Sequence, residues 1–200
     1  MTDSVITTII TDKKKNDKKS VKNRAINGKN FEIITDIENK LYENDYQKEN
    51  LNKKNKYGYY LYKSIDNNNK IIYLSQNGFK LYIKKMFNIE VFRCPDEAYI
   101  IKNDKNYVIK ILEKKEQGVE GSVETKLWAS PSLKREYELI IGDKFVIEYA
   151  LCLNKYLEKK INSDNKKYKI LKQILDESKI NIFYGENNDY FEKIYNWINN

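Results

Sequence analysis

Two carboxylates, Asp96 and Glu113, flank a segment whose pattern predicts a β-hairpin. The segment has apolar runs at 98–101 and 107–112, joined by a polar turn at 103–106. If the hairpin folds about the centre of this turn, Asp96 lies directly opposite Glu113. Opposed side chains on neighbouring strands are about 4.5 to 5.5 Å apart at Cβ, which is close enough for both carboxylates to bind one divalent cation.

Such a pair can hold Mg²⁺ for the hydrolysis of a phosphodiester. Mg²⁺ keeps several waters, so one or two carboxylates with substrate oxygens make a sufficient site. The ion neutralises charge on the phosphate and lowers the pKa of the attacking water. The backbone carbonyl of Lys114, beside Glu113, is a candidate for another oxygen ligand. Because side chains alternate along a strand, Lys115 lies on the same face as Glu113, where its ammonium could orient the attacking water.

An ordinary surface hairpin is the alternative interpretation of the same residues. Glu-x-Lys triplets are common in this lysine-rich chain and also begin at Glu38, Glu158 and Glu177. Glu113 would then form only an incidental ion pair with a neighbouring lysine. The metal site is favoured because one of only two prolines precedes the first acid, because the two acids are in register, and because the strands between them are apolar.

The composition removes most rival chemistries. The chain has no histidine, which excludes Ser-His-Asp and Cys-His catalysis, zinc sites of the usual kind, and nucleases with a histidine base. Its two cysteines, Cys94 and Cys152, are too few for a disulfide framework and fit a reducing compartment. Without an apolar run of about 18 residues or a signal peptide, we expect a soluble intracellular protein with no membrane partner, in the cytoplasm or nucleus of a host cell or in a virion.

The formal net charge of +8 favours a polyanionic partner such as nucleic acid. Much of the excess comes from lysines between positions 13 and 22. We therefore expect residues 1–26 to be a basic, weakly structured segment. It either assists non-specific DNA binding or is a solvated tail without a binding role.

Residues 27–200 fit a single domain of alternating helices and strands. The expected helices cover 29–43, 76–87, 131–142, 166–178 and 189–199, and the expected strands cover 57–63, 70–74, 98–101, 107–112, 145–153 and 180–184. The segments 43–56 and 117–130 are expected to be loops, and a helix is the alternative for 145–153. This order predicts an α/β fold with a mixed central β-sheet and helices on both faces.

The Pro-Asp pair at 95–96 and the Glu-Lys-Lys triplet at 113–115 resemble the PD-(D/E)xK motif of the restriction-endonuclease-like nuclease superfamily. The resemblance covers about residues 28–153. It implies a restriction-endonuclease-like core, which consists of a helix, a three-stranded meander, a helix and a fourth strand. It also implies that Asp96 and Glu113 bind the metal.

Two further site residues rest on this resemblance alone. Members of the superfamily often carry a glutamate on the first helix, and residues 28–32 match their Gly-x-x-Phe-Glu pattern. Glu32 is therefore implied as a further metal ligand, with a solvated helix glutamate as the alternative. Gln117 matches a glutamine found two positions after the motif lysine, here Lys115, in related nucleases.

The stretch 113–140 is similar to endonucleases encoded by large DNA viruses of eukaryotes. Together these resemblances imply a DNA endonuclease that uses Mg²⁺, or Mn²⁺ in its place, and cuts double-stranded DNA as a type II restriction-like homodimer. A repair nuclease or junction resolvase is one alternative, and a non-catalytic nucleic-acid-binding protein with a degenerate nuclease fold is another. The candidates for DNA contacts are the polar and basic residues that follow the motif: Lys114, Ser122, Thr125, Lys126, Lys134 and Arg135.

Overall fold

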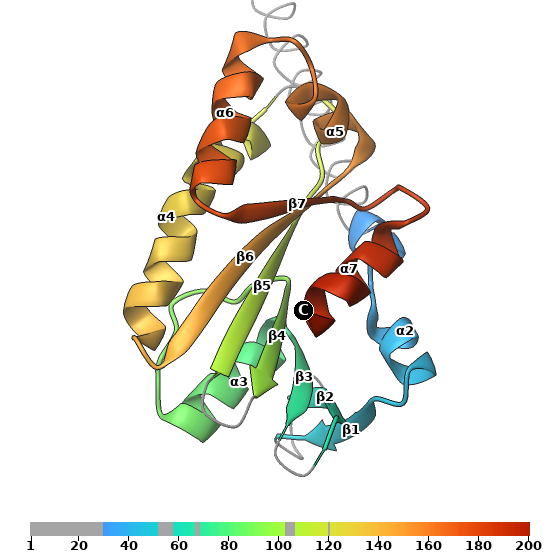
Figure 1. Ribbon diagram of the computed structural model, residues 1–200, viewed down its shortest axis with the longest axis vertical. Coiled ribbons are helices and arrows are strands. Elements are labelled where there is room, and N and C mark those ends of the chain that lie inside the picture. Colours follow the sequence, from blue (N-terminus) through green and yellow to red (C-terminus); the bar gives the residue numbers. More distant parts are fainter. Residues whose placement is uncertain (1–29, 52–57, 67–68, 103–106, 120) are drawn as a thin grey trace, which may run out of the picture.

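The computed structural model describes residues 30–51, 58–66, 69–102, 107–119 and 121–200 (Figure 1). These residues form one seven-stranded sheet in which the strands lie side by side in chain order. The strands are β1 (Gln47–Asn50), β2 (Tyr59–Ser64), β3 (Lys70–Ser75), β4 (Glu97–Lys102), β5 (Tyr107–Lys115), β6 (Phe145–Leu153) and β7 (Ile180–Tyr184). Neighbours from β1 to β5 are antiparallel, whereas β5, β6 and β7 are parallel.

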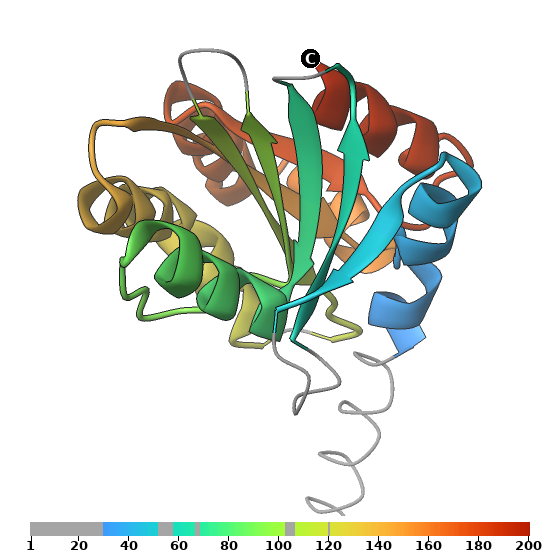
Figure 2. The same cartoon turned by 90° about the horizontal axis from the view of Figure 1, so that it is seen from below.

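Helices cover both faces of this sheet (Figure 2). They are α2 (Glu38–Glu43), α3 (Gln76–Phe87), α4 (Val123–Ile141), α5 (Lys155–Ile161), α6 (Lys166–Glu177) and α7 (Tyr190–Asn199). Apolar side chains of α3, α4, α5 and α6 pack on one face, and those of α2 and α7 pack on the other. The predicted α/β class, with a mixed central sheet between helices, is confirmed.

The hairpin of β4 and β5 has the register that its sequence predicts. Glu97 pairs with Leu112 and Ile101 pairs with Val108, so the strands are aligned about the centre of the 103–106 connection, which itself lies outside the described residues. Both strands are central, and their apolar side chains are buried on both faces. Each fully buried isoleucine or leucine contributes about 1.5–3 kcal/mol, which fixes this register firmly.

A parallel crossover follows the hairpin. The chain leaves β5, passes through α4 and returns as β6, which pairs with β5 along its whole length. The run 145–153 is therefore a buried strand, and its helical alternative is wrong. The predicted helix 76–87 and strand 180–184 agree with α3 and β7.

The helix expected over 29–43 is interrupted at Thr35. The described part has helical residues at 30–34 and again in α2. The Thr35 hydroxyl donates to the carbonyl of Phe31 at 2.6 Å, and the Thr35 carbonyl accepts from Lys114 Nζ at 3.1 Å and from the Tyr190 hydroxyl at 3.3 Å. These tertiary contacts take the carbonyl that a continuous helix would use, and Ile34, just before the break, is exposed.

Three other local expectations need correction. The segment 43–56, expected to be a loop, contains β1, a polar strand at the sheet edge whose four residues are all exposed. The helix α5 lies in a region for which no element is predicted. The helix α4 begins at Val123, eight residues before Pro131, which lies inside it. Buried Leu127 and a hydrogen bond from the Tyr168 hydroxyl of α6 to Glu124 at 2.6 Å hold the first turns of α4, so proline does not start the helix.

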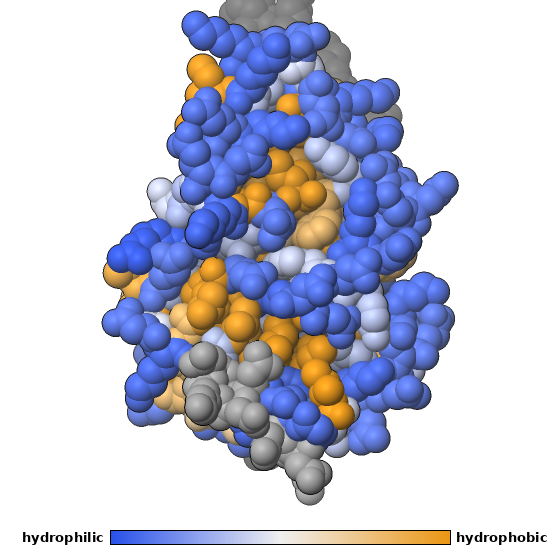
Figure 3. All heavy atoms as spheres, in the orientation of Figure 1, coloured by the Kyte–Doolittle hydropathy of each residue, from blue (hydrophilic) through white to orange (hydrophobic). Residues whose placement is uncertain are grey.

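The basic segment 1–26 lies outside the described residues. Within the described part, no helix is both long enough and apolar enough to cross a membrane. Hydrophilic side chains cover most of the face seen in Figure 3, and apolar side chains are visible along its middle.

Candidate functional site

Three neighbouring strands bring Gln76, Asp96 and Glu113 to the same end of the sheet. Gln76 follows β3, Asp96 precedes β4, and Glu113 lies near the end of β5. Within the sheet, Ser75 of β3 pairs with Glu97 of β4, which in turn pairs with Leu112 of β5. One position further along, the same pairings align Gln76 with Asp96 and Asp96 with Glu113. The alignment of the two acids is the one that the sequence of the hairpin predicts.

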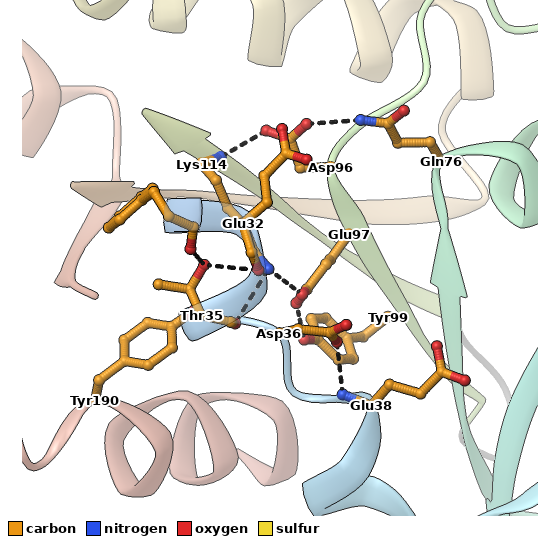
Figure 4. A network of polar contacts seen from close by, with 11 residues as sticks. Glu32, Thr35, Asp36, Glu38, Gln76, Asp96, Glu97, Tyr99, Lys114 and Tyr190 are labelled. Atoms are coloured by element: carbon orange, nitrogen blue, oxygen red, sulfur yellow. Dashed lines mark hydrogen bonds and ion pairs between the residues drawn. The ribbon is translucent and has the colours of Figure 1, made fainter. Parts of the chain in front are cut away.

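The carboxylate of Asp96 is held by contacts from three directions. Its Oδ1 accepts a hydrogen bond from Gln76 Nε2 at 2.9 Å, and its Oδ2 accepts one from the backbone N–H of Lys114 at 2.7 Å (Figure 4). The Lys115 ammonium lies 3.6 Å from the same Oδ2. The backbone N–H of Lys114 thus holds Asp96 in place, and the carbonyl of the same residue stays a predicted metal ligand.

Glu113 and Lys115 form an ion pair beside Asp96. Their Oε2 and Nζ atoms are 2.5 Å apart, so one ammonium contacts both carboxylates. The side chains of Asp96, Glu113 and Lys115 are only 18%, 16% and 14% exposed. Burial raises the pKa of Glu113 above its ordinary value, Lys115 lowers it and Asp96 raises it. The alternative interpretation, an ordinary surface hairpin, predicts an ion pair between Glu113 and a neighbouring lysine. This ion pair is present, but its two side chains are largely buried.

Two buried tyrosines lie on the same side of the sheet. Tyr137 of α4 and Tyr149 of β6 have ring centroids 6.5 Å apart. Burial, followed by the charge of Glu113, raises the pKa of both hydroxyls. Among the described residues neither hydroxyl has a hydrogen-bond partner. Buried hydroxyls are rarely unsatisfied, so these two are available to a water or a bound group.

The side chain of Lys114 points to the opposite face of the sheet, which corrects its assignment as a DNA contact. Its ammonium lies 2.5 Å from Glu97 Oε1, and the two side chains are 5% and 3% exposed. Burial lowers the pKa of Lys114, but Glu97 together with Cys152 and Asp36 raises it, so that the pKa lies above its ordinary value. Tyr99 donates to Glu97 at 2.6 Å. Strand alternation places this buried network on the face of the sheet opposite to Asp96 and Glu113. Figure 4 shows Lys114, Glu97 and Tyr99 together in it.

Glu32 and Gln117 are not bonded to the two carboxylates. Glu32 is exposed on the helical residues 30–34, and its side chain points toward Asp96 in Figure 4. Gln117 is buried, and its Nε2 donates to the carbonyl of Val119 at 2.5 Å. Within the described ranges, no group of three or more acidic or cysteine side chains is arranged to hold a metal.

The remaining DNA-contact candidates lie on or next to α4. Ser122, Thr125 and Lys126 are exposed at its start, and Lys126 is close enough to lower the pKa of Glu113. Lys134 donates to the carbonyl of Ser178 at 2.8 Å, which links α4 to the residue that follows α6. Arg135, the sixth candidate, pairs with Glu138 at 2.8 Å and stays largely exposed. Among these candidates, the residues at the start of α4 are therefore the ones whose side chains a ligand can reach.

Sequence reasoning did not identify Gln76 as part of this site. The sequence predicts a strand at 70–74 and a helix from 76, which makes Gln76 the first residue of that helix. Its proximity to Asp96 depends on the pairing of β3 with β4, which are joined by α3 and a further loop. No turn signal fixes that pairing, whereas the short polar sequence at 103–106 predicts the pairing of β4 with β5.

Comparisons with protein-family models, with curated proteins and with solved structures give no match to this chain.

Proposed function

We propose that the protein is a Mg²⁺-dependent DNA endonuclease whose metal ligands are Asp96 and Glu113. The observation that carries this proposal is the convergence of both carboxylates on one ammonium, that of Lys115, at a largely buried position. A position that accommodates one cation between two carboxylates has the chemistry of a divalent-ion site. Two carboxylates with waters and substrate oxygens are a sufficient donor set for Mg²⁺.

The order of elements around these residues supports the restriction-endonuclease-like core. The strands β3, β4 and β5 form an antiparallel meander, α4 crosses over, and β6 returns parallel to β5. The motif acids lie at the second and third strands of this meander. Helical residues 30–34 precede the meander, with Glu32 directed toward Asp96 (Figure 4). Glu32 therefore remains a candidate for a further ligand of the metal.

The chain's own residues have distinct roles in this proposal. When bound, Mg²⁺ supplies charge neutralisation at the phosphate and a lowered pKa for the attacking water. Asp96 keeps its orientation through the backbone N–H of Lys114. Lys115, once released from its ion pair, orients the water or donates to the phosphate oxyanion. Such assistance is typically worth about 10²–10⁴ in rate.

The exposed start of α4 provides the first phosphate contacts. Lys126, Thr125 and Ser122 lie there, and contacts of this kind fix the position of a DNA backbone without reading bases. The net charge of +8 agrees with a nucleic-acid substrate. A restriction-like enzyme would act on duplex DNA as a homodimer, with one site for each strand.

Cleavage assays on labelled linear duplex, single-stranded DNA and a four-way junction, each with Mg²⁺ or with EDTA, test this proposal. We expect Mg²⁺-dependent cuts at discrete positions of the duplex. Preferential cutting of the junction would instead favour a resolvase. DNA binding without cleavage in Mg²⁺ or Mn²⁺ would favour a non-catalytic binding protein.

A further inference from the structure

We infer that Gln76 is a positioning residue that holds the Asp96 carboxylate in the orientation needed to bind the cation, an inference that rests on the proposed function. Gln76 is the first residue of α3, directly after β3, and its side chain reaches across the end of the sheet to Asp96 (Figure 4). The distance from Gln76 Nε2 to Asp96 Oδ1 is 2.9 Å.

The orientation of the Gln76 amide is dictated by its partner. An ionised carboxylate only accepts hydrogen bonds, so the amide nitrogen must face Asp96. The amide is neutral, whereas the other side chain on Asp96 is the Lys115 ammonium. A cation that binds Asp96 repels the ammonium but does not repel the amide. Gln76 can therefore keep its contact in the metal-bound protein, when Lys115 must move.

The base of this side chain is fixed by the packing of α3. A Cβ atom on Gly78 would lie 2.6 Å from the backbone carbonyl of Tyr59, so glycine allows the first turn of α3 to contact β2 directly. Phe79 and Ile83 on the same helix are fully buried. The backbone of Gln76 is thus anchored next to the site, although its side chain is exposed.

Hydrogen-bond partners of metal ligands orient those ligands, and their loss typically costs 10- to 100-fold in metal affinity. An exposed glutamine with a purely structural role would instead change thermal stability without changing metal affinity. Mn²⁺ affinity, measured together with the melting temperature, separates these two roles. Neither measurement requires DNA cleavage.

The experiment measures Mn²⁺ binding by isothermal titration calorimetry and thermal unfolding of the metal-free protein for four chains: wild type, Gln76→Ala, Asp96→Ala and, as the matched control, Asn77→Ala. Asn77 is the next residue and is also an exposed amide. We expect Gln76→Ala to bind Mn²⁺ about 10- to 100-fold more weakly with an unchanged melting temperature, and Asn77→Ala to match the wild type.

Three outcomes overturn the inference in distinguishable ways. If Asp96→Ala binds Mn²⁺ more weakly but Gln76→Ala binds it as the wild type does, the role of Gln76 is refuted and the proposed metal site stands. If Asp96→Ala retains wild-type affinity, the proposed metal site fails and the inference fails with it. A melting temperature of Gln76→Ala that falls together with its affinity would show structural support and would also refute positioning.

Discussion

The ammonium of Lys115 lies 2.5 Å from Oε2 of Glu113, on the side of the sheet that carries Asp96. The same ammonium lies 3.6 Å from Asp96 Oδ2. This single ammonium therefore offsets one of the two negative charges that the acids carry. A divalent ion held by both carboxylates must displace it, because two positive charges a few ångströms apart repel strongly in a largely buried site.

Replacing Lys115 by methionine should consequently strengthen metal binding while slowing cleavage. We expect Mn²⁺ affinity to rise about tenfold, since the competing charge is removed, and cleavage to fall about 10²–10⁴-fold. Titration calorimetry and a plasmid assay on the same preparation measure both effects. Lys126→Met, at an exposed lysine, is the control and should change affinity less. Weaker Mn²⁺ binding in Lys115→Met would refute this competition.

The buried pair of Lys114 and Glu97 should control stability rather than DNA binding. Lys114→Met leaves the Glu97 carboxylate buried without its partner, which typically costs about 3–5 kcal/mol. Adding Glu97→Gln should recover part of this loss, because the uncompensated charge is removed. Urea unfolding measures these free energies. A Lys114→Met protein with wild-type stability and weakened DNA binding would restore Lys114 as a DNA contact.

Stability should depend on pH through Glu113. Its pKa is raised above the ordinary 4.5, mainly by burial, so the charged form is less favoured in the folded protein than in the unfolded chain. Glu113 therefore lowers stability above its folded pKa, and this cost vanishes below its ordinary pKa. We expect Glu113→Gln to melt at a higher temperature than the wild type near pH 7, and the difference to shrink as the pH approaches 4.

The control for this measurement is Glu90→Gln. A hydrogen bond from Lys84 lowers the pKa of Glu90, so its charged form is favoured in the folded protein and the substitution should give no gain near pH 7. Thermal unfolding between pH 4 and pH 8 compares the two variants. An advantage of Glu113→Gln that grows toward low pH would contradict the assignment.

Gly185, between β7 and α7, should resist substitution because of its close neighbours. An added Cβ would lie 2.5 Å from Thr35 Cγ2 and 2.8 Å from both Cys152 Sγ and Phe31 Cζ. Gly185→Ala would push away the segment that carries Glu32, at a cost of about 1–3 kcal/mol. Gly118→Ala is the matched control, since its added Cβ meets nothing within 4 Å. Equal melting temperatures for the two variants would refute this packing.

Local patterns predicted those parts of the fold that local contacts determine. The 103–106 connection fixed the register of β4 and β5, and alternation along β5 placed Glu113 and Lys115 on one face. The same alternation turns Lys114 to the other face, which is why its assignment as a DNA contact was wrong.

Features that depend on distant contacts could not be predicted in this way. The helix break at Thr35 results from Lys114 and Tyr190, which are 79 and 155 residues away in the chain. Gln76 reaches Asp96 only because β3 pairs with β4. The edge strand β1 has no apolar alternation, so its sequence pattern is that of a loop.

Nicking of supercoiled plasmid by wild type and by Asp96→Asn, in Mg²⁺, tests the central claim most directly. The substitution keeps the size of Asp96 and removes a charged metal ligand, while Glu90→Asn controls for the loss of an exposed acid. We predict that Asp96→Asn cuts at least about 10²-fold more slowly than wild type and that Glu90→Asn cuts at the wild-type rate. Cleavage by Asp96→Asn at the wild-type rate would contradict a metal site at Asp96 and Glu113.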